Sequence, residues 1–330
     1  MIFHLALNSL FVFLMMVLAV EAILVVFKVN HPRLRMICRS IPLFKLPLDL
    51  LFFALIQENG FANFNPCSCE IYFHEFLSIH FPEIFKIALS THPVIIPTYI
   101  ASVIPSSWMA GVVGLICVGA FGLFFWRLGT LLSSFLCLKE ILRKATPYPY
   151  SVHNLKLASQ LQASLVKVRV TDQIAIPCAV YPNTILFPTL LLQHLQTEER
   201  EAILAHELEH LQWNDPLFKA LQTLICAFFW WIPTLKWRNK IYADQEEASD
   251  YAVLKYEIPK ESLAAALIKV AKITRKPFPA SGLTCSLSNA ESPTFQRIAR
   301  LLVPTVPCGS LKLSVVFTLC IAAYLLIWAC

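Results

Sequence analysis

The sequence predicts an integral membrane protein of mainly α fold, in which about four transmembrane helices carry a cytoplasmic α+β domain inserted before the last span. Hydrophobic residues make up 57% of the 330 residues and charged residues only 15%, whereas soluble globular domains have about 25% charged residues. Several apolar runs are long enough to cross a hydrocarbon layer of about 30 Å. A long polar block before the last run is large enough for a domain of ordinary size.

Three apolar runs predict a membrane region over residues 1–138, and a fourth predicts a C-terminal span. Their approximate bounds are 5–27, 41–56, 108–138 and 311–330. The second run is the weakest, because Lys45 and Asp49 lie near its start. The first run is either an uncleaved anchor or a signal peptide ending near Ala22. The absence of Lys and Arg before the run favours the anchor.

The basic residues alternate between connecting segments and so predict the orientation. Segment 28–40 holds four of them, segment 57–93 holds mainly acids, and basic residues return from Lys139 onwards. Because cytoplasmic loops are enriched in Lys and Arg, we expect both termini outside and residues 139–305 inside, across a bacterial inner membrane. This bias also explains the net charge of +6. The bilayer is therefore an expected partner, and nucleic acid is not.

The block 139–305 predicts a mixture of helices and strands. Apolar spacing and turn signals indicate a helix at 152–165, strands at 167–171 and 184–187, and a helix at 197–212. Thr197 is expected to be the N-cap of that helix. Asp215, followed by a proline, is expected to cap the next one.

The motif His206-Glu207-x-x-His210 lies inside the helix predicted at 197–212. Residues four apart in a helix lie on the same face, so both imidazoles can bind one metal ion. Glu207 lies beside them as a carboxylate that can take a proton from the attacking water, which is the zincin arrangement. Glu209 flanks this face on the other side and is expected to be solvated.

A catalytic zinc site needs a third protein ligand, and an acidic run supplies a candidate. Glu246 and Asp250 stand four apart in a second predicted helix. We expect Glu246 to bind the metal and Asp250 to accept a proton from the free ring nitrogen of a ligand histidine. The alternative is an ordinary solvated acidic face.

The apolar segment 217–233 is almost long enough to cross the membrane. If it crossed, residues 240–300 would lie on the opposite side from His206, and the acidic run could not join the histidines. We therefore interpret the segment as a membrane-dipping or core helix that returns to the same side. Its tryptophan-rich end suits an interface.

The chain resembles the membrane metallopeptidases of the BlaR/MecR antirepressor type, which belong to the gluzincins. The resemblance covers roughly residues 100–305, and it rests on segments 185–188, 197–200, 203–210, 246–250 and 252–254. It implies one zinc ion held by His206, His210 and Glu246, with Glu207 as the general base, in a domain between the third and fourth spans. Antirepressors of this type carry an external penicillin-binding sensor after the last span. This sequence ends at Cys330, so direct sensing of β-lactams is not expected.

The same resemblance implies supporting and substrate-binding residues. Asp250 and Asp215 become supporting residues of the zinc site. The strand with Thr184, Ile185 and Leu186 becomes the sheet edge that pairs with an extended substrate.

A related gluzincin group, the CAAX-processing and quality-control proteases, carries a run near its end to which segment 292–298 is similar, although the histidine of that run is missing here. By this similarity Arg297 either stabilises the oxyanion of the tetrahedral intermediate or simply anchors the chain at the cytoplasmic surface.

The resulting expectation is a zinc endopeptidase that cuts a peptide bond near the cytoplasmic face of the membrane. Its substrate would be a protein or peptide, either the chain itself or a regulator in signal transduction. A CAAX-type or quality-control protease is the first alternative. A membrane sensor or scaffold with an idle zinc site is the second, although such a site has no need of Glu207. A homodimer is left open.

Overall fold

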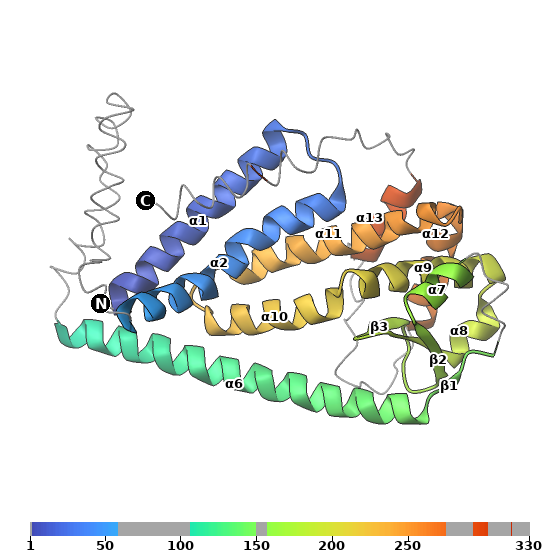
Figure 1. Ribbon diagram of the computed structural model, residues 1–330, viewed down its shortest axis with the longest axis horizontal. Helices are drawn as coiled ribbons and strands as arrows, with labels where there is room; N and C mark the ends of the chain where they lie inside the picture. Colours follow the sequence, from blue (N-terminus) through green and yellow to red (C-terminus); the bar gives the residue numbers. More distant parts are fainter. Residues whose placement is uncertain (1, 59–105, 150–156, 275–292, 303–317, 319–330) are drawn as a thin grey trace.

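The computed structural model describes residues 2–58, 106–149, 157–274, 293–302 and 318. Within them the protein is mainly helical, as the sequence predicts, with one small sheet at one end (Figure 1). One group of helices runs side by side and away from the sheet; it consists of α1 (Ile2–Val26), α2 (Pro32–Glu58), α6 (Ser106–Lys144), α10 (Asp215–Phe228) and α11 (Thr234–Lys255).

Helix α6 is, within the described part of the chain, the helix that is long and apolar enough to cross a membrane, from Ala110 to Lys144. Large apolar side chains such as Leu115, Phe125 and Phe135 are exposed along it. Exposed apolar surface of this extent suits contact with lipid. The predicted first run lies in α1, where Val12–Val26 forms a shorter apolar stretch. The predicted span 311–330 lies outside the described residues, apart from Thr318.

The prediction of a basic loop at 28–40 is wrong in its extent. Helix α1 ends at Val26 and α2 begins at Pro32, so only a short connection separates them. Arg35 and Arg39 lie on α2 and form ion pairs with Asp244 of α11. The charges of these arginines are paired with an acid of a helix that is distant in sequence. The backbone is therefore helical from Pro32 onwards, although the local charge predicts a solvated loop.

Segment 217–233 forms most of α10 and the turn after it, and α11 then runs back alongside towards the sheet (Figure 1). The turn is packed on both sides. Phe229 and Ile232 join a buried cluster with Phe13 of α1 and Leu43 of α2. On the other side, the indole Nε1 of Trp230 donates a hydrogen bond to the carbonyl of Ile116 on α6, at 3.3 Å. The hairpin is therefore held between α1, α2 and α6.

A substitution on α6 tests this packing. A Cβ atom at Gly119 would lie 2.6 Å from Trp230 Nε1, whereas a Cβ atom at Gly122 would meet nothing within 4 Å. We expect Gly119→Ala to displace the indole, break its hydrogen bond and lower the free energy of unfolding by about 1–3 kcal/mol. The matched control Gly122→Ala should cause no loss. Thermal unfolding of the two variants in nanodiscs measures the difference, and equal midpoints would contradict the close packing.

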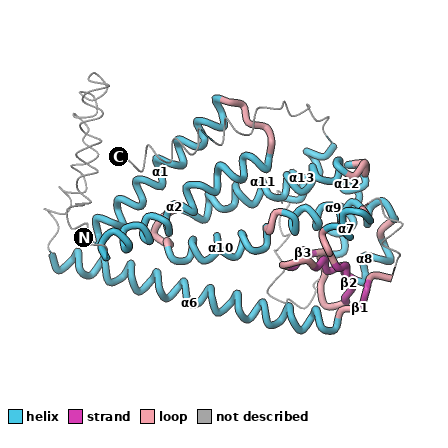
Figure 2. The backbone as a smooth tube through the Cα atoms, viewed as in Figure 1, coloured by secondary structure: helices cyan, strands magenta, loops and turns pink. Residues whose placement is uncertain are grey.

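The strands, magenta in Figure 2, lie together at one end of the protein. They form one sheet with the order β1-β2-β4-β3. Its strands are β1 (Thr146–Pro147), β2 (Lys167–Thr171), β3 (Cys178–Val180) and β4 (Thr184–Pro188). β4 pairs in parallel with β2, placing Val168 opposite Ile185, and pairs antiparallel with β3. The prediction that Thr184, Ile185 and Leu186 form a substrate-pairing edge is therefore wrong, because both sides of β4 are already hydrogen-bonded within the sheet. The edge strand beside it is β3.

The core of the polar domain lies between the sheet and α9 (Thr197–Gln212). Ile185 and Phe187 of β4 and Leu204 and Leu208 of α9 are completely buried in one cluster. Short helices α7 (Ala158–Ala163) and α8 (Thr189–His194) flank the sheet, and α12 (Lys260–Thr274) and α13 (Pro293–Leu302) pack beyond α9. This packing buries α9 on several faces, so its polar side chains lie inside the protein and must find partners there.

Candidate metal centre

Helix α9 places His206 and His210 side by side. It spans Thr197–Gln212, and its N-cap is Gln196 rather than the predicted Thr197. Gln196 and Glu199 form a reciprocal capping box that satisfies free backbone N–H groups of the first turn. Two turns further on, the Nε2 atoms of His206 and His210 lie 3.2 Å apart, and both rings are buried.

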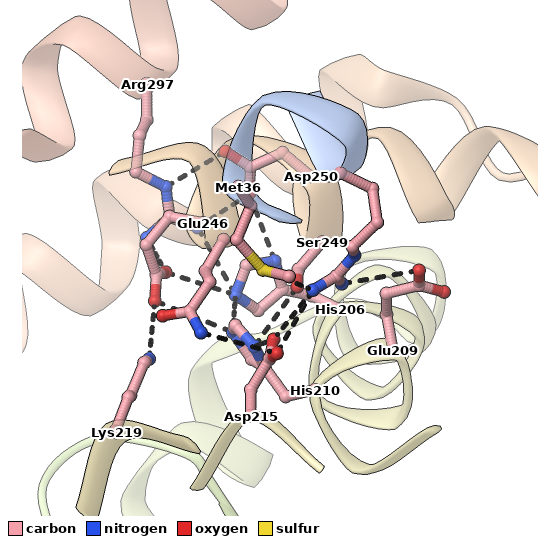
Figure 3. A network of polar contacts seen from close by, with 12 residues as sticks. Met36, His206, Glu209, His210, Asp215, Lys219, Glu246, Ser249, Asp250 and Arg297 are labelled. Atoms are coloured by element: carbon pink, nitrogen blue, oxygen red, sulfur yellow. Dashed lines mark hydrogen bonds and ion pairs between the residues drawn. The ribbon is translucent and has the colours of Figure 1, made fainter. Parts of the chain in front are cut away.

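Helix α11 brings Glu246 to the same point from elsewhere in the chain (Figure 3). Its carboxylate oxygens lie 3.5 Å from His206 Nε2 and 3.6 Å from His210 Nε2. Ligands at zinc bond lengths of about 2.0–2.1 Å stand about 3.3 Å apart at the corners of a tetrahedron. The two imidazole nitrogens are close to that separation, one oxygen of Glu246 lies near each of them, and with one ligand atom per residue the three donors lie within 4.8 Å of one another. Imidazole nitrogen and carboxylate oxygen are donors that zinc accepts. The three residues therefore fit a zinc ion.

Each histidine has a carboxylate on its other ring nitrogen. His206 Nδ1 lies 3.0 Å from Asp250 Oδ1, and His210 Nδ1 lies 2.7 Å from Asp215 Oδ2. Ser249 Oγ also approaches His210 Nδ1, at 3.2 Å. Such contacts hold a ring in place and direct its Nε2 lone pair towards the common point.

Two cations flank the Glu246 carboxylate. Arg297 of α13 lies 2.9 Å from Oε2, and Lys219 of α10 lies 3.1 Å from Oε1 (Figure 3). Arg297 also binds Asp250, at 2.6 Å, and its Nη2 is 3.4 Å from His206 Nε2. The surface-anchor alternative for Arg297 does not fit the structure, because its side chain is only 16% exposed and pairs with Glu246 and Asp250. Stabilisation of the oxyanion stays a prediction.

Electrostatics keeps the carboxylates of the site ionised. Burial favours the neutral acid at Glu246, but Lys219 and Arg297 outweigh burial and hold the pKa of Glu246 well below its usual range. Burial likewise opposes ionisation of Asp250, and Arg297 and His206 lower its pKa. At His206 burial would lower the pKa, yet its contacts with Asp250 and Glu246 raise it to about 9. The carboxylates therefore carry negative charge, and a metal ion that binds here would displace a proton from His206.

Glu209 and Asp215 both lie inside the protein. Glu209 is not solvated as predicted, because its side chain is only 3% exposed and is paired with Arg33 and Lys255. Asp215 begins α10, but the structure shows no side-chain cap there. Its carboxylate contacts His210 and Arg33 instead, so the capping prediction is wrong.

The charge of Glu207 is felt both near the donors and at β3: against the effect of burial, it helps to raise the pKa of Lys219 and of Arg297, the two cations beside Glu246. Glu207 is buried, and its charge is felt at the thiol of Cys178 on β3: burial first, and then Glu207, raise the pKa of Cys178 to about 12. The carboxylate next to the histidines is therefore close to the cations of the metal centre and also to the edge strand β3, which packs against α9.

Sequence reasoning missed Arg33, Lys219 and Ser249. Arg33 and Lys219 carry no local pattern that distinguishes them from other basic residues near a membrane. Ser249 sits within the acidic run, and no local signal marks it as a contact of His210. Only the folded arrangement shows that each of the three contacts a donor or a donor's partner.

Comparison with known proteins gives one family match. A family model described as BlaR1 peptidase M56 matches residues 10–301, which run from α1 to α13 and include every residue of the centre. No curated protein shows a significant match to the chain.

Proposed function

Because the chain belongs to the M56 family of BlaR1-type peptidases, we propose that it is a membrane-embedded zinc endopeptidase that cuts a peptide bond near the cytoplasmic face of the membrane. The observation that carries this proposal is the convergence of His206, His210 and Glu246, whose donor atoms all lie within 4.8 Å of one another. A purely structural or idle zinc site would leave the neighbouring Glu207 without a task.

The residues around the donors supply what peptide hydrolysis needs. Zinc held there would lower the pKa of water towards about 7 and polarise a carbonyl. Glu207 accepts a proton from the attacking water and delivers it to the leaving amine. Arg297, a buried cation beside His206, is placed to stabilise negative charge that develops on the scissile carbonyl oxygen. Asp250 and Asp215 keep the two imidazoles oriented.

The substrate is proposed to lie along β3. An extended peptide can add to the free edge of a sheet through backbone hydrogen bonds. β3 ends the sheet on the side of α9, and its Cys178 lies within reach of the Glu207 charge. This arrangement would bring a scissile bond past the general base. In this proposal β3 replaces β4 as the strand that pairs with the substrate, because β4 has no free edge within the described sheet.

The position of the centre favours a substrate close to the membrane. α10 and α11 lead from the centre towards the N-terminal third of α6, where Trp230 contacts Ile116, and α6 is the candidate span. The basic residues Lys139, Arg143 and Lys144 lie at the end of α6 nearest the sheet, as expected for the cytoplasmic side. The substrate would be the chain itself, a soluble regulator or another membrane protein, in a multi-pass arrangement with a cytoplasmic catalytic domain.

Metal removal and replacement test the proposal. The purified chain in nanodiscs should bind one zinc ion, lose peptide hydrolysis on dialysis against a chelator, and regain it when zinc is added back. A peptide library analysed by mass spectrometry would reveal the cleaved bonds. A full complement of zinc with no cleavage of any peptide or co-reconstituted membrane protein would contradict an endopeptidase.

A further inference from the structure

We propose that Arg33, at the start of α2, is a positioning residue that orients the zinc ligand His210 through Asp215, and so connects the α1–α2 helix pair to the metal centre. This inference rests on the proposed zinc site and extends it to a residue that the sequence places in a membrane-flanking basic segment.

The contacts of Arg33 are those of an interior residue. Its side chain is 4% exposed. Nη1 lies 3.1 Å from both carboxylate oxygens of Asp215, and Nη2 lies 3.4 Å from Glu209. The guanidinium also stands 4.8 Å from the ring of Trp213. A residue that only marked the cytoplasmic side of a span would keep its charge in water.

Asp215 contacts both Arg33 and the zinc ligand His210. Its side chain is completely buried, and its Oδ2 lies 2.7 Å from His210 Nδ1. A buried carboxylate is costly unless it is paired, and the paired cation is Arg33. The Arg33 guanidinium contacts both oxygens of Asp215 and so fixes the carboxylate in position. Without it, the carboxylate would be free to turn, and His210 would lose the partner that directs its other nitrogen to zinc.

Ion pairs also connect α2 to α11, the helix that carries Glu246. Arg35 and Arg39 pair with Asp244, and Arg35 pairs with Glu247, both on α11. Arg33 differs from these neighbours because its chain of contacts ends on a zinc ligand. A displacement of α2 relative to α9 and α11 would therefore reach His210 through Arg33 and Asp215.

A double-mutant cycle on zinc affinity tests the role. The variants are Arg33→Gln, Asp215→Asn and the double variant, each as the full chain in nanodiscs, titrated with zinc against a competing chelator dye. We expect each single change to weaken zinc binding by about 10–100-fold. The double variant should be no weaker than Asp215→Asn alone, because Arg33 acts through Asp215. Arg33→Lys should lose less affinity than Arg33→Gln, since the charge remains but a single ammonium group cannot keep both the contact of Nη1 with Asp215 and that of Nη2 with Glu209.

Arg35→Gln is the matched control. It removes an arginine two residues away on α2 whose partners are Asp244 and Glu247, and it should leave zinc affinity unchanged. Visible spectra of the cobalt-loaded proteins report the ligand geometry independently, and only the Arg33 and Asp215 variants should alter them.

Three outcomes would overturn the inference. The first is unchanged zinc affinity in Arg33→Gln. The second is an additive loss in the double variant. The third is an equal loss in Arg35→Gln, which would indicate general destabilisation. If Arg33→Gln does not fold, Arg33→Lys decides by the same criteria. A wild-type chain that binds no zinc would instead overturn the proposed function, and the inference with it.

Discussion

Replacing Glu207 with Gln is expected to reduce peptide hydrolysis by about 10²–10⁴-fold while one zinc ion stays bound, because the amide cannot accept the proton from the attacking water. Glu207 is not among the donors that converge, so its loss leaves the metal ligands in place. The change is isosteric, and the fold around α9 should be retained.

The sharpest measurement compares peptide termini in whole cells that make the wild-type chain with those in cells that make Glu207→Gln. Termini that disappear in the variant identify both the activity and its substrate. Glu198→Gln is the matched control, since Glu198 is an exposed glutamate on the first turn of the same helix. If all candidate cleavages persist in Glu207→Gln, the membrane sensor or scaffold becomes the better interpretation.

Glu246→Gln is expected to abolish stable zinc binding, with a loss of affinity of more than about 100-fold. The substitution removes the only anionic donor of the group His206, His210 and Glu246. It also removes the carboxylate that pairs with both Lys219 and Arg297, and these two cations remain beside the imidazoles. An incoming zinc ion would then face two nearby cations, so the effect should exceed that of losing one ligand.

Zinc content after dialysis against a chelator measures this prediction. Glu247→Gln is the control: it changes the next residue on α11, whose carboxylate pairs with Arg35 and Arg300. That variant should keep its zinc. One zinc ion per chain in Glu246→Gln would show that the third ligand is another residue, and it would undermine the geometry on which the proposed function depends.

Local patterns predicted the elements that carry the donors, although not all their details. The helix 197–212 has the bounds that the sequence indicates, because its apolar positions and acidic first turn are local signals. Strands β2 and β4 likewise lie where alternation and turn residues place them. The cap of α9 was missed by one residue, since Gln196 and Glu199 cap each other where threonine is the usual choice.

Errors arose where a residue's partner lies far along the chain. Arg33 and Asp215 are 182 residues apart. From its own neighbours, Arg33 is interpreted as a basic residue that flanks a span, and Asp215 as a helix cap. The edge prediction failed for the same kind of reason. The residues of β4 carry no signal that β2 and β3 lie on either side of it, because the strand order depends on the path of the whole chain.

The sequence by itself determined a histidine pair at helical spacing with a glutamate between, an acidic helix to follow, and apolar runs suited to lipid, because these depend on period and composition. Only the tertiary structure decided that Glu246 meets both rings, that Arg297 and Lys219 neutralise it, and that α2 reaches His210 through Asp215. Contacts between distant segments arise when buried charges must find partners inside a packed core. The identity of those partners depends on how the helices are arranged in space, and a local sequence pattern does not determine that arrangement.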